Sequence, residues 1–161
     1  MHPLDPSSAA PFVAETLKIL RDEVGPETAV LGFVGCPYTL ATYMVEGKTS
    51  KEYLNIKKMA FNEPKLLHAI LQNLADSIGD YALYQIENGA QLIQIFDSWA
   101  GLLGKEDYKV FSLNYINDLV QQLKEDDVTK DTPVIIFARQ PKGGIEQLSA
   151  CKPECISLYW D

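Results

Sequence analysis

The chain has 161 residues and a mass of 18.0 kDa, the size of one ordinary domain, and we expect residues 1–161 to form a single domain. Hydrophobic residues make up 47% of the chain and charged residues 22%, which excludes a chain too polar to fold. The 14 basic and 22 acidic residues give a net charge of −8, and this balance argues against binding to nucleic acid or to an anionic membrane.

Four short apolar runs alternate with segments whose apolar residues recur at helical spacing. The first run, 28–34, is almost entirely apolar and predicts a strand buried on both faces. Gly25-Pro26 ends the helix before this run, and Pro64 interrupts the long helical segment after it. In chain order we predict a helix over 12–24, a strand over 28–34, a helical segment over 50–89, a strand over 92–96, a helix over 105–124, a strand over 133–137, a helix over 143–150 and a strand over 155–159.

Strands that alternate with helices predict β-α-β units and a parallel sheet, so the fold class is α/β. No glycine-rich phosphate-binding motif follows a predicted strand, which leaves nucleotide binding without support. The residues that follow the four strands are instead Tyr38 and Tyr43, then Asp97, Ser98 and Trp99, then Arg139 and Lys142, and finally Asp161. A β/α barrel keeps its chemistry at this end of its strands, but a closed barrel needs eight strands and ~250 residues. Four strands in 161 residues predict a partial TIM-type (β/α) barrel of about four β/α units.

Two blocks carry a resemblance to a known family. Residues 32–47 read GFVGCPYTLATYMVEG, which resembles the G-F-x-G-x-P-[WY]-T-L-x-T-Y-x-V-E-G segment of uroporphyrinogen decarboxylases. Residues 91–100, QLIQIFDSWA, resemble a second block of the same family, and the stretches 2–6, 88–90 and 157–160 match as well. The resemblance runs nearly from end to end of this chain and covers the middle of the family's longer chain.

The resemblance implies a β/α barrel enzyme of tetrapyrrole synthesis. The family converts uroporphyrinogen III to coproporphyrinogen III by decarboxylating four acetate side chains, without a metal or an organic cofactor. Tyr43 and Ser98 match the family's substrate-contacting tyrosine and serine. The family's arginine-rich motif and essential aspartate lie upstream of the matching segment and its late histidine lies downstream. We therefore assign no catalytic residue to this chain and expect it to be inactive alone.

Some positions depart from the family pattern. The loop 138–144 differs from the family's small, Gly- and Ser-rich turn, and Tyr159 stands where an acid is usual. Arg21 and Arg139 are the only arginines, although the substrate carries eight carboxylates, which charge-assisted arginine contacts would hold. These departures favour a pseudoenzyme that serves as an interaction or structural subunit, whereas the intact block 32–47 favours a piece of a decarboxylase. A corrinoid-dependent methyltransferase would share the fold, but it would need His/Cys zinc-ligand spacing that the sequence lacks.

Other polar residues receive a structural interpretation. Asp97 has no second carboxylate at a usable spacing, so a structural or N-cap role is favoured over catalysis. His68 lies among apolar residues at helical spacing, and Cys151 and Cys155 have no nearby histidine, so no metal site is predicted. Cys36 is expected simply to pack.

The expected surroundings follow from the same features. An open half barrel leaves two sheet edges and an apolar interior uncovered, so we expect a homo-oligomer or a larger protein assembly, with a porphyrinogen substrate if the barrel is completed. No transmembrane segment and no secretory signal are recognised, and three unrelated cysteines favour a reducing compartment. The cytoplasm or the plastid stroma would suit a tetrapyrrole enzyme.

Overall fold

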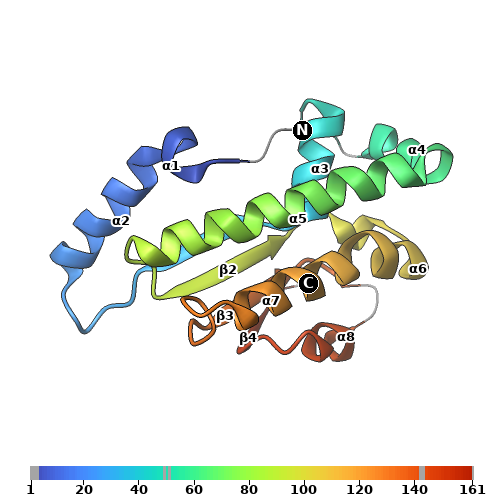
Figure 1. Cartoon of the computed structure of the whole chain (residues 1–161). Helices are drawn as coiled ribbons and strands as arrows, with labels where there is room; N and C mark the ends of the chain where they lie inside the picture. Colours follow the sequence, from blue (N-terminus) through green and yellow to red (C-terminus); the bar gives the residue numbers. More distant parts are fainter. Residues whose placement is uncertain (1–3, 49, 51, 142–143, 161) are drawn as a thin grey trace.

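The computed structural model describes residues 4–48, 50, 52–141 and 144–160. Its elements alternate between helices and strands, as the sequence predicts (Figure 1). In chain order they are α1 (Pro6–Ala9), α2 (Pro11–Val24), β1 (Leu31–Gly35), α3 (Pro37–Glu46), α4 (Leu54–Asn62), α5 (Pro64–Glu87), β2 (Leu92–Asp97), the 3₁₀ turn η1 (Ala100–Leu102), α6 (Lys105–Tyr108), the π-helical turn η2 (Lys109–Leu113), α7 (Asn114–Glu125), β3 (Val134–Ala138), α8 (Ile145–Ala150) and β4 (Cys155–Leu158).

The strands form one parallel sheet in the order β1-β2-β3-β4. Each strand therefore pairs with the next one along the chain, which is the connectivity of successive β/α units in a barrel. The sheet is open, because β1 and β4 lie at opposite edges. The predicted partial barrel of about four units is confirmed.

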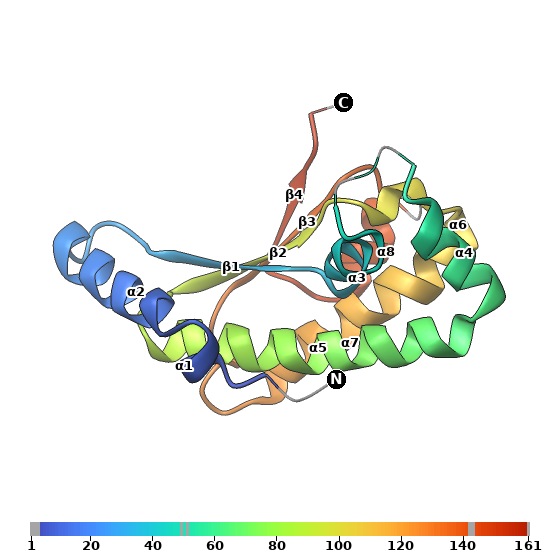
Figure 2. The same cartoon turned by 90° about the horizontal axis from the view of Figure 1, so that it is seen from above.

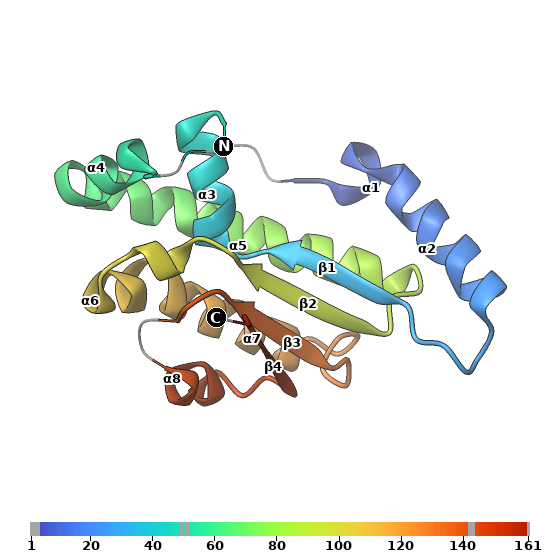
Figure 3. The same cartoon turned by 180° about the vertical axis from the view of Figure 1, so that it is seen from behind.

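Helices α5 and α7 cover one face of the sheet (Figure 2). Between sheet and helices lies the hydrophobic core, in which Ile93, Ile95 and Ile136 are fully buried. On the opposite face no described helix or strand covers the sheet, and Figure 3 shows the strands open to view from that side. The chain is thus a two-layer unit with one bare face.

The bare face corrects one prediction. Strand 28–34 was expected to be buried on both faces, but Leu31 is 41% exposed and Phe33 is 62% exposed, while Val34 is buried. Strand side chains alternate between the two faces of a sheet. Every second residue of β1 therefore points away from the helices, and its apolar character fits a barrel interior, which this chain alone does not enclose.

The predicted helix over 105–124 is also not continuous. It contains the π-helical turn Lys109–Leu113, which accommodates extra residues between α6 and α7. This turn places Ser112 in the core, where its Oγ donates to Asp97 Oδ2 at 2.9 Å. Apolar periodicity alone does not reveal such a change of pitch.

Several boundaries differ by a few residues. The segment expected to turn helical at Ser50 becomes helical at Leu54, and the break before Pro64 is confirmed because α5 begins at that residue. A short helix, α1, lies in the lead-in, where Asp5 accepts from Ser7 N at 3.0 Å. Part of the predicted helix 143–150 falls at Gly143, outside the described residues.

The edge of the sheet at β1 carries a side-chain cap. The Nε2 of Gln85, on α5, donates to Phe33 O at 3.0 Å, and its Oε1 accepts from Phe33 N at 3.1 Å. Gln85 is buried, and its amide takes up both backbone groups that the ladder with β2 leaves free at Phe33. The middle of this edge is thereby satisfied without a neighbouring strand.

Candidate functional site

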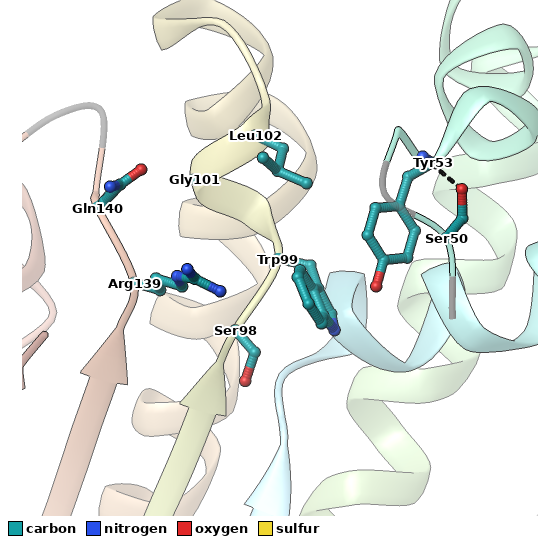
Figure 4. Close-up of a pocket in the computed structure, with 8 residues that line it drawn as sticks. All are labelled: Ser50, Tyr53, Ser98, Trp99, Gly101, Leu102, Arg139 and Gln140. Carbon is teal, nitrogen blue, oxygen red and sulfur yellow. Dashed lines mark hydrogen bonds between the residues drawn. The ribbon is translucent and has the colours of Figure 1, made fainter. Parts of the chain in front are cut away.

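A cleft of about 600 Å³ lies at the carboxyl ends of β2 and β3 (Figure 4). Its walls come from the loop after β2, the loop after β3 and the segment between α3 and α4. The described residues that line it are Ser50, Tyr53, Ser98, Trp99, Gly101, Leu102, Arg139 and Gln140. This is the end of the strands at which β/α barrels carry their ligand and catalytic groups.

Close backbone approach brings two of these walls together. A Cβ on Gly101 would overlap the carbonyl oxygen of Arg139 and would lie 2.9 Å from that of Gln140. The loops after β2 and β3 can therefore touch only because residue 101 has no side chain. The backbone N of Arg139 also donates to Asp97 O at 3.0 Å, which extends the pairing of β2 and β3 into the cleft wall.

An aromatic cluster forms the second side of the cleft. Trp99 Nε1 donates to the hydroxyl of Tyr43 at 2.7 Å, and the rings of Trp99 and Tyr53 lie 4.9 Å apart. Tyr53 precedes α4 with a φ of 50°, and its backbone N donates to Ser50 Oγ at 3.1 Å. The hydroxyl of Tyr53 is buried and has no hydrogen-bond partner among the described residues. Trp99 thus joins α3 to the cleft.

Glu46, the last residue of α3, holds the start of α4. Its Oε1 accepts from the backbone N of Asn55 at 2.8 Å and of Ile56 at 3.1 Å, and its Oε2 accepts from Asn55 Nδ2 at 3.0 Å. A carboxylate at a helix N-terminus satisfies otherwise unpaired N–H groups. The glutamate of the 32–47 block therefore fixes the start of α4, next to Tyr53.

Arg139 is the one cation among the described residues that line the cleft. Its guanidinium carbon lies 4.5 Å from the ring centre of Tyr159 and 6.0 Å from that of Trp99. The other arginine, Arg21, donates to Thr28 O at 2.9 Å and to Gln91 Oε1, which lie at the amino ends of β1 and β2. The two arginines consequently belong to opposite ends of the sheet.

Asp97 ends β2 with its side chain in the core between sheet and helices, not in the cleft. Its oxygens accept from Ser112 Oγ at 2.9 Å, Thr39 Oγ1 at 3.3 Å and Ala100 N at 3.3 Å. Burial raises the pKa of this carboxyl from 3.8 to about 6, although the hydrogen bonds oppose the rise. The bond from Ala100 N ties Asp97 to the start of η1, in line with the structural role expected for it.

Of the two predicted substrate-binding residues, Ser98 lies in the wall of the cleft and Tyr43 lies beside it. Ser98 lines the cleft, and its backbone N donates to Thr39 Oγ1 at 3.1 Å. Tyr43 is 39% exposed and adjoins the cleft through its hydrogen bond with Trp99. Of the other residues expected after the strands, Trp99 and Arg139 line the cleft, Tyr38 is buried, and Lys142 and Asp161 lie outside the described residues.

Sequence reasoning missed Tyr53 entirely, and it named Arg139 without assigning it a role. Tyr53 comes from a connection whose sequence carries no motif, so nothing signalled its place beside Trp99. The partners of Arg139 come from two different loops, and only the fold brings Tyr159 and Trp99 to it.

The remaining candidates are structural. Cys36 is buried with its Sγ 3.6 Å from Ser112 Oγ, and burial raises the pKa of its thiol. His68 Nδ1 is hydrogen-bonded to the hydroxyl of Tyr115 at 2.7 Å on the helical layer.

In the part of the chain that the structure describes, no group of three or more His, Cys, Asp or Glu residues is placed to hold a metal ion. Nor is any described helix both long and apolar enough to cross a bilayer.

Comparisons with known proteins agree with this geometry. The family model described as Uroporphyrinogen decarboxylase (URO-D) matches residues 1–161. Curated proteins named uroporphyrinogen decarboxylase match over 160 residues, which is 99% of this chain: 46% identical in Thermosynechococcus vestitus, 48% in Nostoc punctiforme and 49% in Microcystis aeruginosa. The chain spans 45–46% of the length of these relatives.

Among solved structures, a methyltransferase from Methanosarcina mazei has a similar fold. The TM-score is 0.76 over 97% of this chain and 47% of that chain, at 21% sequence identity, so the likeness concerns the fold alone.

Fold and site together define one part of a β/α barrel, with a cleft at the carboxyl ends of its strands. The match of the whole chain to the family model and the identity to its curated members are decisive: this chain belongs to the uroporphyrinogen decarboxylase family.

Proposed function

We propose that the chain supplies one side of the active site of a decarboxylase that converts uroporphyrinogen III to coproporphyrinogen III in tetrapyrrole synthesis. The observation that carries the proposal is the position of Ser98 in a carboxyl-end cleft, in a chain 46–49% identical to proteins named uroporphyrinogen decarboxylase. We place this role in heme and chlorophyll synthesis, in the cytoplasm or the plastid stroma; the named relatives are cyanobacterial, which fits the cytoplasm.

Tyr43 and Ser98 hold substrate carboxylates in this proposal. The Tyr43 hydroxyl accepts from Trp99 Nε1, and among the described residues its own hydrogen has no acceptor. A hydroxyl polarised in this way is a good donor to a carboxylate. Ser98 Oγ likewise forms no hydrogen bond with a described residue, so both groups are available to a ligand at the same end of the sheet.

Decarboxylation requires further residues around the substrate. Arg139 is the one cation among the described residues of the cleft, whereas uroporphyrinogen carries eight carboxylates. The exposed side chains of Leu31 and Phe33 also need a covering surface, such as the rest of a barrel. We therefore propose that the chain works in a completed barrel and lacks activity alone.

A second candidate function is that of a non-catalytic subunit in a protein assembly. The observation in its favour is an aromatic row on the bare face, in which the rings of Phe33 and Phe96 lie 6.1 Å apart and those of Phe96 and Phe137 lie 5.5 Å apart. Large apolar patches of this kind mark protein interfaces. The two candidates differ in whether substrate is consumed.

Native mass spectrometry of the chain isolated from its source, followed by a decarboxylation assay on each species, separates them. The proposal expects coproporphyrinogen to form in a species that completes the barrel, with activity falling about tenfold or more in Ser98→Ala or Tyr43→Phe, as the loss of a hydrogen bond to a charged group predicts. Ser149→Ala, on α8, is the matched control and leaves the activity unchanged. A stable complex that never converts uroporphyrinogen would favour the subunit.

A further inference from the structure

The cleft has a local charge opposite to that of the chain. The chain as a whole carries a net charge of −8, with 22 acidic residues. Among the described residues that line the cleft there is one cation, Arg139, and no carboxylate. Asp97, although close in sequence, lies in the core on the helix side of the sheet. An anion entering the cleft therefore meets a single positive charge without a competing acid in the wall.

Arg139 is oriented without being neutralised. Its guanidinium carbon lies 4.5 Å from the ring centre of Tyr159 and 6.0 Å from that of Trp99, and Figure 4 shows the side chain directed from the end of β3 toward Trp99. Within the described ranges its guanidinium takes part in no ion pair and no hydrogen bond. Aromatic faces hold the plane of a guanidinium while leaving its in-plane N–H donors available.

The backbone around Arg139 is equally fixed. Its N–H is bonded to Asp97 O at 3.0 Å, and its carbonyl lies against Gly101. A preorganised cation loses little side-chain entropy on binding an anion. Ser98 and Gln140 stand beside it in the lining and add neutral hydrogen-bonding groups.

We propose that Arg139, which lies over the ring of Tyr159 and near that of Trp99, is a carboxylate anchor that binds one peripheral carboxylate of a tetrapyrrole substrate at the carboxyl end of β3. This inference rests on the proposed function and adds to it a residue that determines substrate affinity. Stacking on an aromatic ring favours the planar guanidinium, so lysine is a poor replacement. Charge-assisted hydrogen bonds of this type change affinity by about 10- to 100-fold.

Tryptophan fluorescence provides the readout. The chain has two tryptophans, so Trp160→Phe leaves Trp99, which contacts Arg139, as the single reporter. Uroporphyrin III is titrated into this chain and its Arg139→Gln and Arg139→Lys derivatives. Lys130→Gln is the matched control, because it removes the same charge from an exposed ion pair with Asp127 in the connection before β3.

We expect Arg139→Gln to weaken uroporphyrin binding by about 10- to 100-fold, Arg139→Lys to recover only part of that loss, and Lys130→Gln to stay within about twofold. Coproporphyrin III, in which methyl groups replace the four acetates, identifies the carboxylate bound: an equal loss for both porphyrins indicates a propionate, and a loss for uroporphyrin alone indicates an acetate.

Equal binding by the parent chain and Arg139→Gln would overturn the anchor while leaving the proposed function standing. Absence of uroporphyrin binding by the parent chain would overturn the anchor as a site that this chain forms alone, whereas the proposed function is tested separately by the decarboxylation assay on a species that completes the barrel. If Arg139→Gln fails to fold, as judged by circular dichroism, Arg139→Lys decides, since it keeps the charge and the aliphatic stem. Binding by Arg139→Lys within about twofold of the parent would then contradict the planar anchor.

Discussion

The buried carboxyl of Asp97 makes the stability of this chain depend on pH in an unusual direction. Burial raises its pKa from 3.8 to about 6. Each pKa unit corresponds to about 1.4 kcal/mol, so ionising Asp97 in the folded chain costs about 3 kcal/mol more than in the unfolded chain. A raised acid pKa means that the folded state binds the proton more tightly. The contribution to the free energy of unfolding is therefore greatest below about pH 4, declines between about pH 4 and 6, and stays low above that range.

Asp97→Asn removes this dependence and keeps the hydrogen bonds. The asparagine Oδ1 can accept from Thr39 and Ala100 as Asp97 Oδ1 does, and its Nδ2 can donate to Ser112 Oγ, whose own hydrogen then turns toward Cys36 Sγ at 3.6 Å. We expect the variant to match the parent near pH 4 and to be about 3 kcal/mol more stable near pH 7.

Urea denaturation of both proteins across this pH range tests the prediction. Subtracting one free energy of unfolding from the other removes the contribution of the carboxylates that both proteins share. Asp127→Asn, at an exposed side chain, serves as the control and should give a difference that is nearly constant with pH. If Asp97→Asn instead loses stability as the pH rises, the hydrogen bonds outweigh burial and the reasoning is refuted.

Substitutions at three further positions probe the framework of the site. Gln85→Leu leaves two backbone groups of Phe33 unpaired and should lower the free energy of unfolding by at least about 2 kcal/mol, measured by urea denaturation; an unchanged midpoint would contradict the cap. Gly101→Ala forces the two cleft loops apart and should cost about 1–3 kcal/mol while shifting the Trp99 emission, measured in the Trp160→Phe chain; unaltered emission and stability would show that the loops yield freely. Glu46→Ala uncaps α4 and should lower the free energy of unfolding by about 1 kcal/mol, whereas Glu46→Gln, which keeps one side-chain oxygen as an acceptor, should lose less. Equal losses would argue against a role for that oxygen at the N-terminus of α4.

The fold was predictable because its signals are local. Alternating apolar runs and helical periodicity located every strand to within a few residues, and Pro64 marked the start of α5. The π-helical turn was not predictable, since it depends on Ser112 reaching Asp97, a contact between separate elements. The exposure of Leu31 and Phe33 was missed for a related reason: an apolar strand indicates what the closed barrel buries, not what one part of it covers.

The site was only half predictable. Tyr43 and Ser98 were identified from short motifs, and their roles remain predictions. The position of Arg139 near Trp99 and Tyr159 depends on the register of β2, β3 and β4, because parallel neighbours bring loops that are distant in sequence to one edge. No local pattern encodes such a meeting of three loops.

The amide of Gln85 makes the two edges of the sheet unequal, because it occupies backbone groups at the β1 edge. A strand that joins beside β1 must first displace this side chain from Phe33, whereas among the described residues no side chain is bonded to the outer backbone groups of β4. Uncapped edges are where sheets recruit new strands, including those of other copies. We therefore expect a further strand to pair with β4 before one pairs with β1. In any barrel that the chain helps to build, the pairing at the Phe33 edge would form last.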